Sequence, residues 1–352
     1  MRNYFAAANT SRGFVCWYND IFDPKKLDFV YIIKGGSGTG KSTLMKKLAA
    51  KAEEKGGICE RYYCSSDPTS LDGIIASMPN GKRIAMLDGT APHTHDPKYP
   101  GAAEAIVDLG KYWCEDILKG QREEIIALSD KKAKLFGEAY GYFGAAGTLL
   151  LSSLSEARGA LLSDKLNAAC ERLLLQRMHE CRVKGSVGQV SIRGLSALST
   201  HGKVYFNSFD DAEKVYLVTD LWGTAPLLFE AMLNTAGKLG LNVCRAPIPL
   251  IPELTEALYF PELSLSIVSR TDKSDVKLLN MARFVERDLL SGDMRVHRRL
   301  IKKSAAELVE TGLARLSEVR TVHGELEKIY MGAMDFTRLG EATRRLLETI
   351  FV

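Results

Sequence analysis

The residues best suited to chemistry lie in one short stretch that reads Gly-Gly-Ser-Gly-Thr-Gly-Lys-Ser-Thr. Glycines at this spacing let backbone N–H groups curl around phosphate oxygens without clashes from Cβ atoms. Lys41 would reach the β- and γ-phosphates of a nucleotide, and the Ser42 hydroxyl would bind Mg²⁺. The stretch therefore predicts a P-loop that binds ATP and Mg²⁺. Its expected nucleotide contacts are Gly35, Gly36, Ser37, Gly38, Thr39, Gly40, Lys41, Ser42 and Thr43.

Two secondary-structure elements are expected to hold this stretch in place. The apolar, β-branched run 29–33 predicts a buried strand, and a helix is expected from Lys41 to about Glu54. The N-terminus of that helix adds free N–H donors and a favourable dipole for phosphate. A chance match in a glycine-rich turn is the alternative, and the flanking strand and helix disfavour it.

A second candidate for chemistry is the aspartate that ends the apolar run 83–88. Ligands of parallel sheets bind outside the carboxyl ends of the strands, so Asp88 is expected to lie beside the predicted P-loop. Its carboxylate would hold Mg²⁺ through water, because Mg²⁺ gives up its hydration shell reluctantly. A helix N-cap or turn aspartate is the simpler alternative, and the upstream P-loop favours the Mg²⁺ role.

Further polar residues follow the predicted strands at the same edge. Asp67 comes after the second strand, and His93, His95 and Asp96 come soon after Asp88. One of Asp67 or His93 could orient water or a substrate hydroxyl for attack on the γ-phosphate. The His-x-His-Asp run could also suggest a transition-metal site, but it lacks the remote ligands that such sites recruit. Solvated loop residues are the plainer interpretation.

The bulk composition limits the class of protein. The chain has 352 residues, of which 46% are hydrophobic and 26% charged, as in soluble globular proteins with two domains. A net charge of +4 disfavours nucleic acid as a partner, although the basic turn at residues 297–303 leaves it open. Seven cysteines without a C-x-x-C pair favour a reducing cytoplasm. We expect no signal peptide, and the apolar run 139–154 is too short for a membrane span.

The second half of the chain repeats the first. Residues 215–228 overlay residues 30–43 at an offset of 185, so that Gly223 aligns with Gly38. The repeat predicts an α/β fold of two tandem P-loop-like parallel sheets with flanking helices, each followed by a helical segment. The expected domains are a P-loop domain with a helical extension at residues 1–190, and a degenerate repeat with a helical tail at 191–352.

Two details complete the predicted fold of the first half. A short helix is expected from about Ser70, after the second strand. From Ala102 to about Lys184 the apolar residues recur every three or four positions, which predicts a helical layer without strands.

The second copy has lost the residues that would contact a nucleotide. Asp220 replaces Gly35, which places a carboxylate where phosphate charge would lie. Pro226 and Leu227 replace Lys41 and Ser42, and Ser269 occupies the position of Asp88. Only the first half is therefore expected to bind a nucleotide. Arg245 or Arg270 of the second half could act on it as an arginine finger.

The whole-chain pattern resembles a bacterial family of duplicated P-loop ATPases, within the P-loop containing nucleoside triphosphate hydrolase superfamily. The resemblance is carried by the P-loop and by the segments 5–10, 13–15, 64–67, 87–93, 96–101, 326–330 and 333–336. It implies an ATP-binding P-loop fold. The second P-loop, which members of the family often keep, is lost here. Separately, the sequence Leu-Asp-Gly at residues 87–89 is similar to a strand end of adenylate-kinase-like enzymes.

These observations favour one function over two alternatives. We expect Mg²⁺-dependent ATP binding and slow hydrolysis in the first half, with the second half as a regulatory or partner-binding lobe. The first alternative is a small-molecule kinase, with Asp67 or Asp88 near the acceptor hydroxyl. The second is a nucleotide sensor that does not hydrolyse and acts through a protein partner. The partner or small-molecule acceptor is not identified by the sequence.

Overall fold

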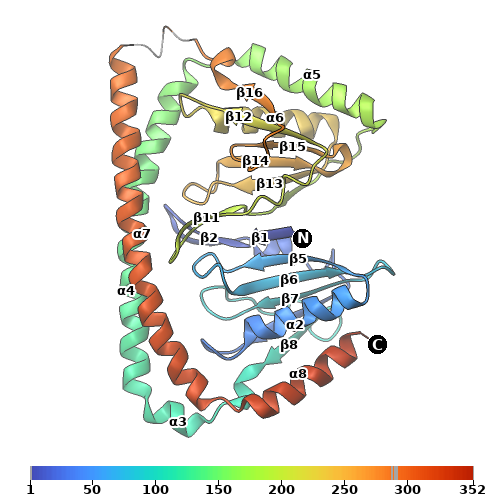
Figure 1. Ribbon diagram of the computed structural model, residues 1–352, viewed down its shortest axis with the longest axis vertical. Helices are drawn as coiled ribbons and strands as arrows, with labels where there is room; N and C mark the ends of the chain where they lie inside the picture. The colour runs from blue at the N-terminus through green and yellow to red at the C-terminus, as the bar shows by residue number, and fades with distance from the viewer. Residues whose placement is uncertain (1, 287, 289–291, 352) are drawn as a thin grey trace.

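The computed structural model describes residues 2–286, 288 and 292–351, and it confirms an α/β fold with two tandem sheet-containing halves (Figure 1). The first six-stranded sheet has the order β1-β5-β6-β7-β4-β8. Its strands are β1 (Arg2–Phe5), β4 (Phe29–Lys34), β5 (Ile58–Tyr63), β6 (Leu71–Ser77), β7 (Arg83–Asp88) and β8 (Glu104–Asp108).

The second six-stranded sheet repeats this arrangement. Its order, β9-β13-β14-β15-β12-β16, matches the first sheet strand for strand. Its strands are β9 (Val190–Ile192), β12 (Lys214–Thr219), β13 (Val243–Pro247), β14 (Thr255–Phe260), β15 (Leu265–Val268) and β16 (Lys277–Asn280). Each half also has a small hairpin, β2 (Ala7–Thr10) with β3 (Gly13–Cys16), and β10 (Ser196–Ser199) with β11 (Gly202–Tyr205).

Both sheets are mixed, so the prediction of parallel sheets was wrong. β6 runs antiparallel to β5 and β7, and β14 runs antiparallel to β13 and β15. The loop between Tyr63 and Leu71 is too short for the crossover of a dozen or more residues that a parallel neighbour requires. The helix expected from about Ser70 is therefore the antiparallel strand β6.

The segment expected to be helical from Ala102 to about Lys184 begins with a strand instead. β8 adds to the free edge of β4 in parallel. Its central residue, Ile106, is 52% exposed, so the strand lacks the buried apolar run that would have marked it in the sequence.

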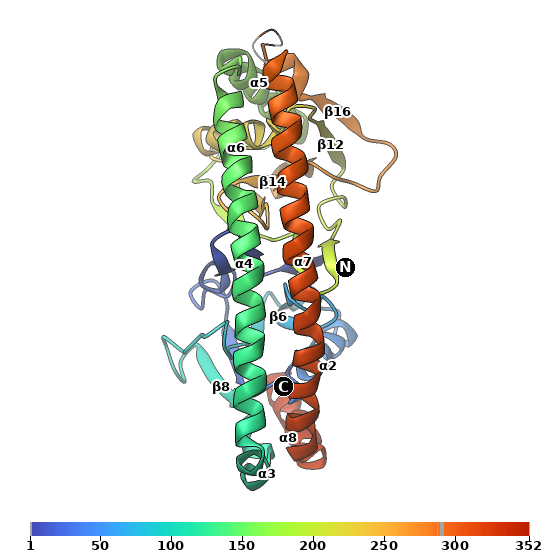
Figure 2. The same ribbon diagram turned by 90° about the vertical axis from the view of Figure 1, so that its left-hand side faces the viewer.

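The helices are α1 (Tyr18–Ile21), α2 (Lys41–Glu54), α3 (Glu115–Gly120), α4 (Arg122–Arg158), α5 (Ser163–Cys181), α6 (Ala225–Leu239), α7 (Asp293–Ala333) and α8 (Phe336–Ile350). The two longest, α4 and α7, lie side by side along both sheets (Figures 1 and 2). Their shared apolar core contains Leu135, Ala139 and Phe143 of α4 together with Leu313 and Leu316 of α7.

The helical segment of each half packs on the sheet of the other half. α5, which follows the first sheet, buries Leu166, Cys170 and Leu174 in the core that contains α6. α8, which follows the second sheet, contributes Leu339 and Ile350 to the core beneath α2. The long helices α4 and α7 thus carry the chain from one sheet to the other.

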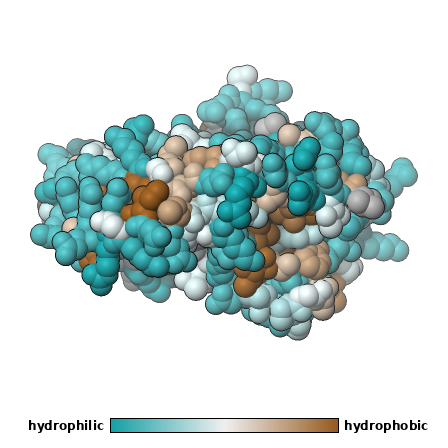
Figure 3. Space-filling model, turned by 90° about the horizontal axis from the view of Figure 1, so that it is seen from below, coloured by the Kyte–Doolittle hydropathy of each residue, from teal (hydrophilic) through white to brown (hydrophobic). Residues whose placement is uncertain are grey.

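The molecular surface is mainly polar where Figure 3 shows it, with scattered apolar patches. Among the residues that the structure describes, no helix combines the length and apolar character that crossing a membrane requires.

Candidate functional site

The glycine-rich loop joins β4 to α2 at the carboxyl edge of the first sheet. The expected strand and the helix Lys41–Glu54 are both confirmed. Gly38 and Gly40 have φ values of 69° and 90°, in the left-handed region that favours glycine, and Gly40 is the N-cap of α2. The free N–H groups of the first helical turn therefore open onto this loop.

Lys41 and Asp88 meet above the loop, as the sequence predicts. The Nζ atom of Lys41 lies 3.5 Å from Oδ2 of Asp88, and both side chains are about 14% exposed or less. The same ammonium donates hydrogen bonds to the carbonyl oxygens of Gly35 and Gly36, at 2.9 and 2.7 Å. Lys41 thus lies folded over the loop.

Asp88 reaches this position because it ends β7, the parallel neighbour of β4. Its Oδ1 atom accepts a 2.8 Å hydrogen bond from the backbone N–H of Thr90, and Oδ2 faces Lys41. Burial raises the pKa of Asp88, the charge of Lys41 lowers it, and the nearby carboxylate of Asp72 raises it further. Lys41 is therefore the main group that keeps this carboxyl ionised.

The other predicted loop residues occupy varied positions. The Ser42 hydroxyl accepts a 2.9 Å hydrogen bond from the backbone N–H of Leu71, at the start of β6. Thr39 is buried and donates a 2.8 Å hydrogen bond to the Gly36 carbonyl. Ser37 is half-buried, whereas Thr43 is exposed.

The C-terminal part of α7 covers the glycine-rich loop. A Cβ atom on Gly36 would lie 2.7 Å from the ring of Tyr330, and one on Gly38 would lie 2.9 Å from Met331. The backbone carbonyl of Glu327 is 3.0 Å from the same point above Gly38. A helix that starts beside the second sheet thus packs directly on the loop of the first.

Ionisable side chains of the two long helices face the loop. Nζ of Lys132 on α4 lies 3.3 Å from Nδ1 of His323 on α7, and Nε2 of His323 lies 3.5 Å from Glu327. Burial and the charges of Lys132 and Lys41 lower the pKa of His323 to about 4. Burial and Lys41 also lower the pKa of Lys132. The charge of Lys41 thus acts on Lys132, and an anion near both ammonium groups would offset their repulsion.

Asp67 lies on the rim of this region. Its carboxylate accepts hydrogen bonds from the backbone N–H and hydroxyl of Thr69, at 3.1 and 2.7 Å. Its charge raises the pKa of Glu327, after the larger effect of burial. Asp67 and Lys41 therefore act in opposite directions on the same carboxyl group, that of Glu327.

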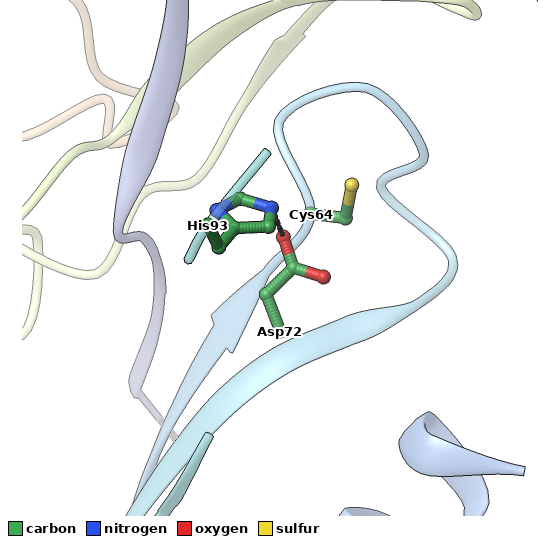
Figure 4. Close-up of side chains that lie close together, drawn as sticks. All are labelled: Cys64, Asp72 and His93. Atoms are coloured by element: carbon green, nitrogen blue, oxygen red, sulfur yellow. Dashed lines mark ion pairs between the residues drawn. The ribbon is translucent and has the colours of Figure 1, made fainter. Parts of the chain in front are cut away.

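His93 lies against Asp72 and Cys64 rather than in solvent (Figure 4). Its Nε2 atom is 2.9 Å from Oδ2 of Asp72, and both side chains are less than 10% exposed. Burial alone would lower the pKa of His93, but the facing Asp72 carboxylate raises it to about 12. The two side chains therefore form a buried ion pair at neutral pH.

His93, His95 and Asp96 each contact a different partner, so the residues of the His-x-His-Asp run do not form one metal site among themselves. Nε2 of His95 is 3.9 Å from the buried carboxylate of Glu104, and burial lowers the pKa of His95. Asp96 is exposed and forms a 2.8 Å ion pair with Lys34. Neither residue joins the group around His93.

In the second half, the carboxylate of Asp220 binds the N-terminus of α6. It accepts hydrogen bonds from the backbone N–H groups of Trp222 and Ala225, at 3.0 and 2.6 Å, and from the Thr224 hydroxyl at 3.1 Å. The loop is one residue shorter here, so α6 begins at Ala225, and this residue rather than Pro226 takes the position of Lys41. The carboxylate thus satisfies donors that a phosphate would use.

The arginines considered as fingers are engaged within the second half. Arg245 donates to the Thr255 hydroxyl at 2.7 Å and to the carbonyl oxygens of Pro252 and Leu254. The guanidinium of Arg270 lies over the ring of Tyr205, 4.9 Å from its centroid.

A cavity of about 410 Å³ lies at the edge of the second sheet that corresponds to the His93 region. Its lining includes Leu198, Ile248, Lys302 and Val309. Glu256 takes the place of Asp72, since each is the second residue of the equivalent strand. The Ser196 hydroxyl donates a 2.5 Å hydrogen bond to the Glu256 carboxylate. Burial raises the pKa of Glu256 to about 7, although the hydrogen bond from Ser196 and the charge of Arg270 lower it.

Glu256→Gln should therefore change how stability depends on pH. The folded chain keeps a proton on Glu256 that the unfolded chain loses above about pH 4.5, so wild-type stability falls as pH rises from about 4.5 to 7. The loss is at most about 3 kcal/mol. Urea unfolding at pH 5 and pH 8 should show a smaller difference for Glu256→Gln than for wild type. An unchanged difference would contradict the assignment.

The sequence assigned no role at the site to five residues near the loop: Asp72, Lys132, His323, Glu327 and Tyr330. Asp72 was hidden because β6 was read as a helix. The other four lie on α4 and α7, whose periodic patterns indicate helices but not where they pack. Their charged side chains look like an ordinary solvated helix face.

Comparison of the chain with protein-family models, with curated proteins and with solved structures found no match in any of the three. The geometry at the carboxyl edge of the first sheet is therefore the basis of the function proposed below.

Proposed function

We propose that the first half of the chain binds ATP with Mg²⁺ and hydrolyses it slowly. The observation that carries this proposal is the meeting of Lys41 and Asp88 above a glycine-rich loop that opens onto the N-terminus of α2. Backbone N–H donors, a buried ammonium and a buried carboxylate are the groups that a Mg²⁺-bound triphosphate requires.

Each residue has a distinct part in this proposal. The N–H groups of residues 36–42 would hold the phosphates, and Lys41 would exchange the Gly35 and Gly36 carbonyl oxygens for phosphate oxygens. Ser42 and Asp88 would hold Mg²⁺, whose oxygen preference suits a hydroxyl and a carboxylate. Bound Mg²⁺ supplies positive charge that offsets the negative charge of the phosphates.

The second half would bind no nucleotide. Asp220 already fills the N-terminus of α6, and Ala225 and Ser269 cannot replace the ammonium and the carboxylate of the first half. Titration with a non-hydrolysable ATP analogue and Mg²⁺ should give one site per chain. Two sites, or none, would overturn the proposal. Phosphate release measured with and without candidate acceptors separates hydrolysis from the kinase alternative.

The contact between α7 and the glycine-rich loop favours a nucleotide sensor as the second candidate. Tyr330 and Met331 pack on the loop from a helix that reaches the second sheet, so a ligand in the loop would act directly on that helix. Tight analogue binding with no phosphate release would support the sensor over the ATPase.

Whether the protein is an ATPase or a nucleotide sensor, Lys132 should contribute to its preference for ATP over ADP. Its side chain is half-buried, and the charge of Lys41 lowers its pKa, so a γ-phosphate bound at Lys41 would also attract the Lys132 ammonium. A charge-assisted hydrogen bond of this kind is worth about 1.5–3 kcal/mol, so Lys132→Ala should reduce that preference by roughly 10- to 100-fold. Lys131→Ala, which removes an exposed lysine from the same helix, is the control. Equal ATP-to-ADP affinity ratios in wild type and Lys132→Ala would refute this role.

A further inference from the structure

Three different metal-binding groups converge beside the proposed nucleotide site. The Sγ atom of Cys64, a carboxylate oxygen of Asp72 and a ring nitrogen of His93 lie within 4.8 Å of one another (Figure 4). They come from three separate parts of the chain: the residue after β5, strand β6 and the loop after β7. Cys64 and Asp72 are far from the His-x-His-Asp run in the sequence, but the fold places both of them beside His93 as possible ligands.

We propose that Cys64, Asp72 and His93 bind a transition-metal dication of the Zn²⁺ type. Zn–S and Zn–N distances of about 2.3 and 2.0 Å place tetrahedral donor atoms about 3.3–3.6 Å apart. The present spacing reaches that geometry if the side chains move by about 1 Å or less. The metal takes the place of the protons on His93 and on the Cys64 thiol, which pass to solvent. Three protein donors leave a fourth position for water.

The surroundings orient the histidine and place a hydrogen-bond donor on the Cys64 sulfur. The ring of His93 stacks on Tyr18, with centroids 5.1 Å apart and planes 5° apart, and Phe14 contacts it edge-on at 4.8 Å. The backbone N–H of Asp67 donates to the Cys64 sulfur at 3.4 Å. Such second-layer contacts orient metal ligands in known sites.

This site is distinct in chemistry from the proposed Mg²⁺ site at Ser42 and Asp88. Thiolate and imidazole select Zn²⁺-like ions, whereas Mg²⁺ prefers oxygen ligands and keeps most of its water. The proposal does not depend on nucleotide binding. The competing explanation is that His93 and Asp72 form a permanent ion pair and Cys64 takes no part.

Titration of the reduced, metal-free chain with Co²⁺ separates these explanations. We expect one Co²⁺ per chain, with a thiolate-to-metal charge-transfer absorption that Zn²⁺ abolishes and excess Mg²⁺ leaves unchanged. Co²⁺ binding without the charge-transfer absorption, or displacement by Mg²⁺, would overturn the proposal. The wild-type measurement is decisive by itself, because it needs no variant to fold.

Two variants assign the ligands. Cys64→Ser and Asp72→Asn should each weaken Co²⁺ binding by at least about tenfold, and Cys64→Ser should also remove the charge-transfer absorption. Cys181→Ser is the matched control, because it removes another half-buried thiol, in this case from α5. Circular dichroism checks that each variant is folded. Unchanged affinity and absorption in folded Cys64→Ser would rule out this site.

Discussion

Lys41→Ala is expected to weaken ATP binding by about 100-fold and to reduce phosphate release to background. The ammonium is the buried positive charge at the proposed phosphate site, and hydrogen bonds to charged groups contribute about 1.5–3 kcal/mol each. Isothermal titration with the non-hydrolysable analogue measures the loss of affinity. Lys47→Ala is the matched control, because it removes an exposed lysine from the same helix.

The same variant should also lose some stability. Lys41 bonds two loop carbonyl oxygens and neutralises Asp88, so its removal leaves a buried carboxylate without its partner. Binding should therefore be measured well below the unfolding temperature of the variant. If folded Lys41→Ala binds the analogue as tightly as Lys47→Ala, the nucleotide site has been assigned to the wrong loop.

The sequence predicts the strand, the loop and the helix around Lys41 because their signals are local. Glycine spacing, an apolar run and a helical period each extend over fewer than about fifteen residues. The convergence of Asp88 on Lys41 followed from a general rule about parallel neighbours, and β4 and β7 are such neighbours. The duplication likewise predicted two tandem sheets, and the structure shows that the two sheets share one strand order.

β6 was misread because its sequence lacks a clear strand pattern. Leu71-Asp-Gly-Ile-Ile-Ala-Ser places a charged residue and a glycine in its first half, although β-branched residues follow. Asp72 is tolerated there because His93 neutralises it within the folded chain. The partner that makes this strand stable is distant in the sequence, so a local pattern could not reveal it.

The packing of α7 on the glycine-rich loop could not be predicted from the local sequence pattern either. Tyr330 and Gly36 touch although almost the whole chain separates them. The sequence predicts a helical tail for the second half, but it does not say that α7 extends past its own sheet. The exchange of helices between the halves follows from packing along α4 and α7, where the apolar faces of two long helices meet.

Asp88→Asn is expected to separate Mg²⁺-dependent turnover from nucleotide binding. Asparagine keeps the shape of the side chain and can still accept the hydrogen bond from Thr90, but it removes the charge that would hold Mg²⁺. Turnover at saturating Mg²⁺ and ATP should fall by at least about 100-fold, since Mg²⁺ neutralises charge that develops on the phosphates. Asp96→Asn removes an exposed carboxylate near the same edge of the sheet and serves as the control.

The affinity for ATP without Mg²⁺ should not fall in Asp88→Asn, in contrast to turnover. The wild-type carboxylate repels phosphate and holds Lys41 at 3.5 Å, so its removal frees the ammonium for the nucleotide. Asp88→Asn should therefore bind metal-free ATP at least as tightly as wild type does. The two assays together distinguish a metal ligand from a structural residue, because a residue that only supports the loop would lower both turnover and metal-free binding when replaced. Equal losses in the two assays would show that Asp88 serves the fold of the loop.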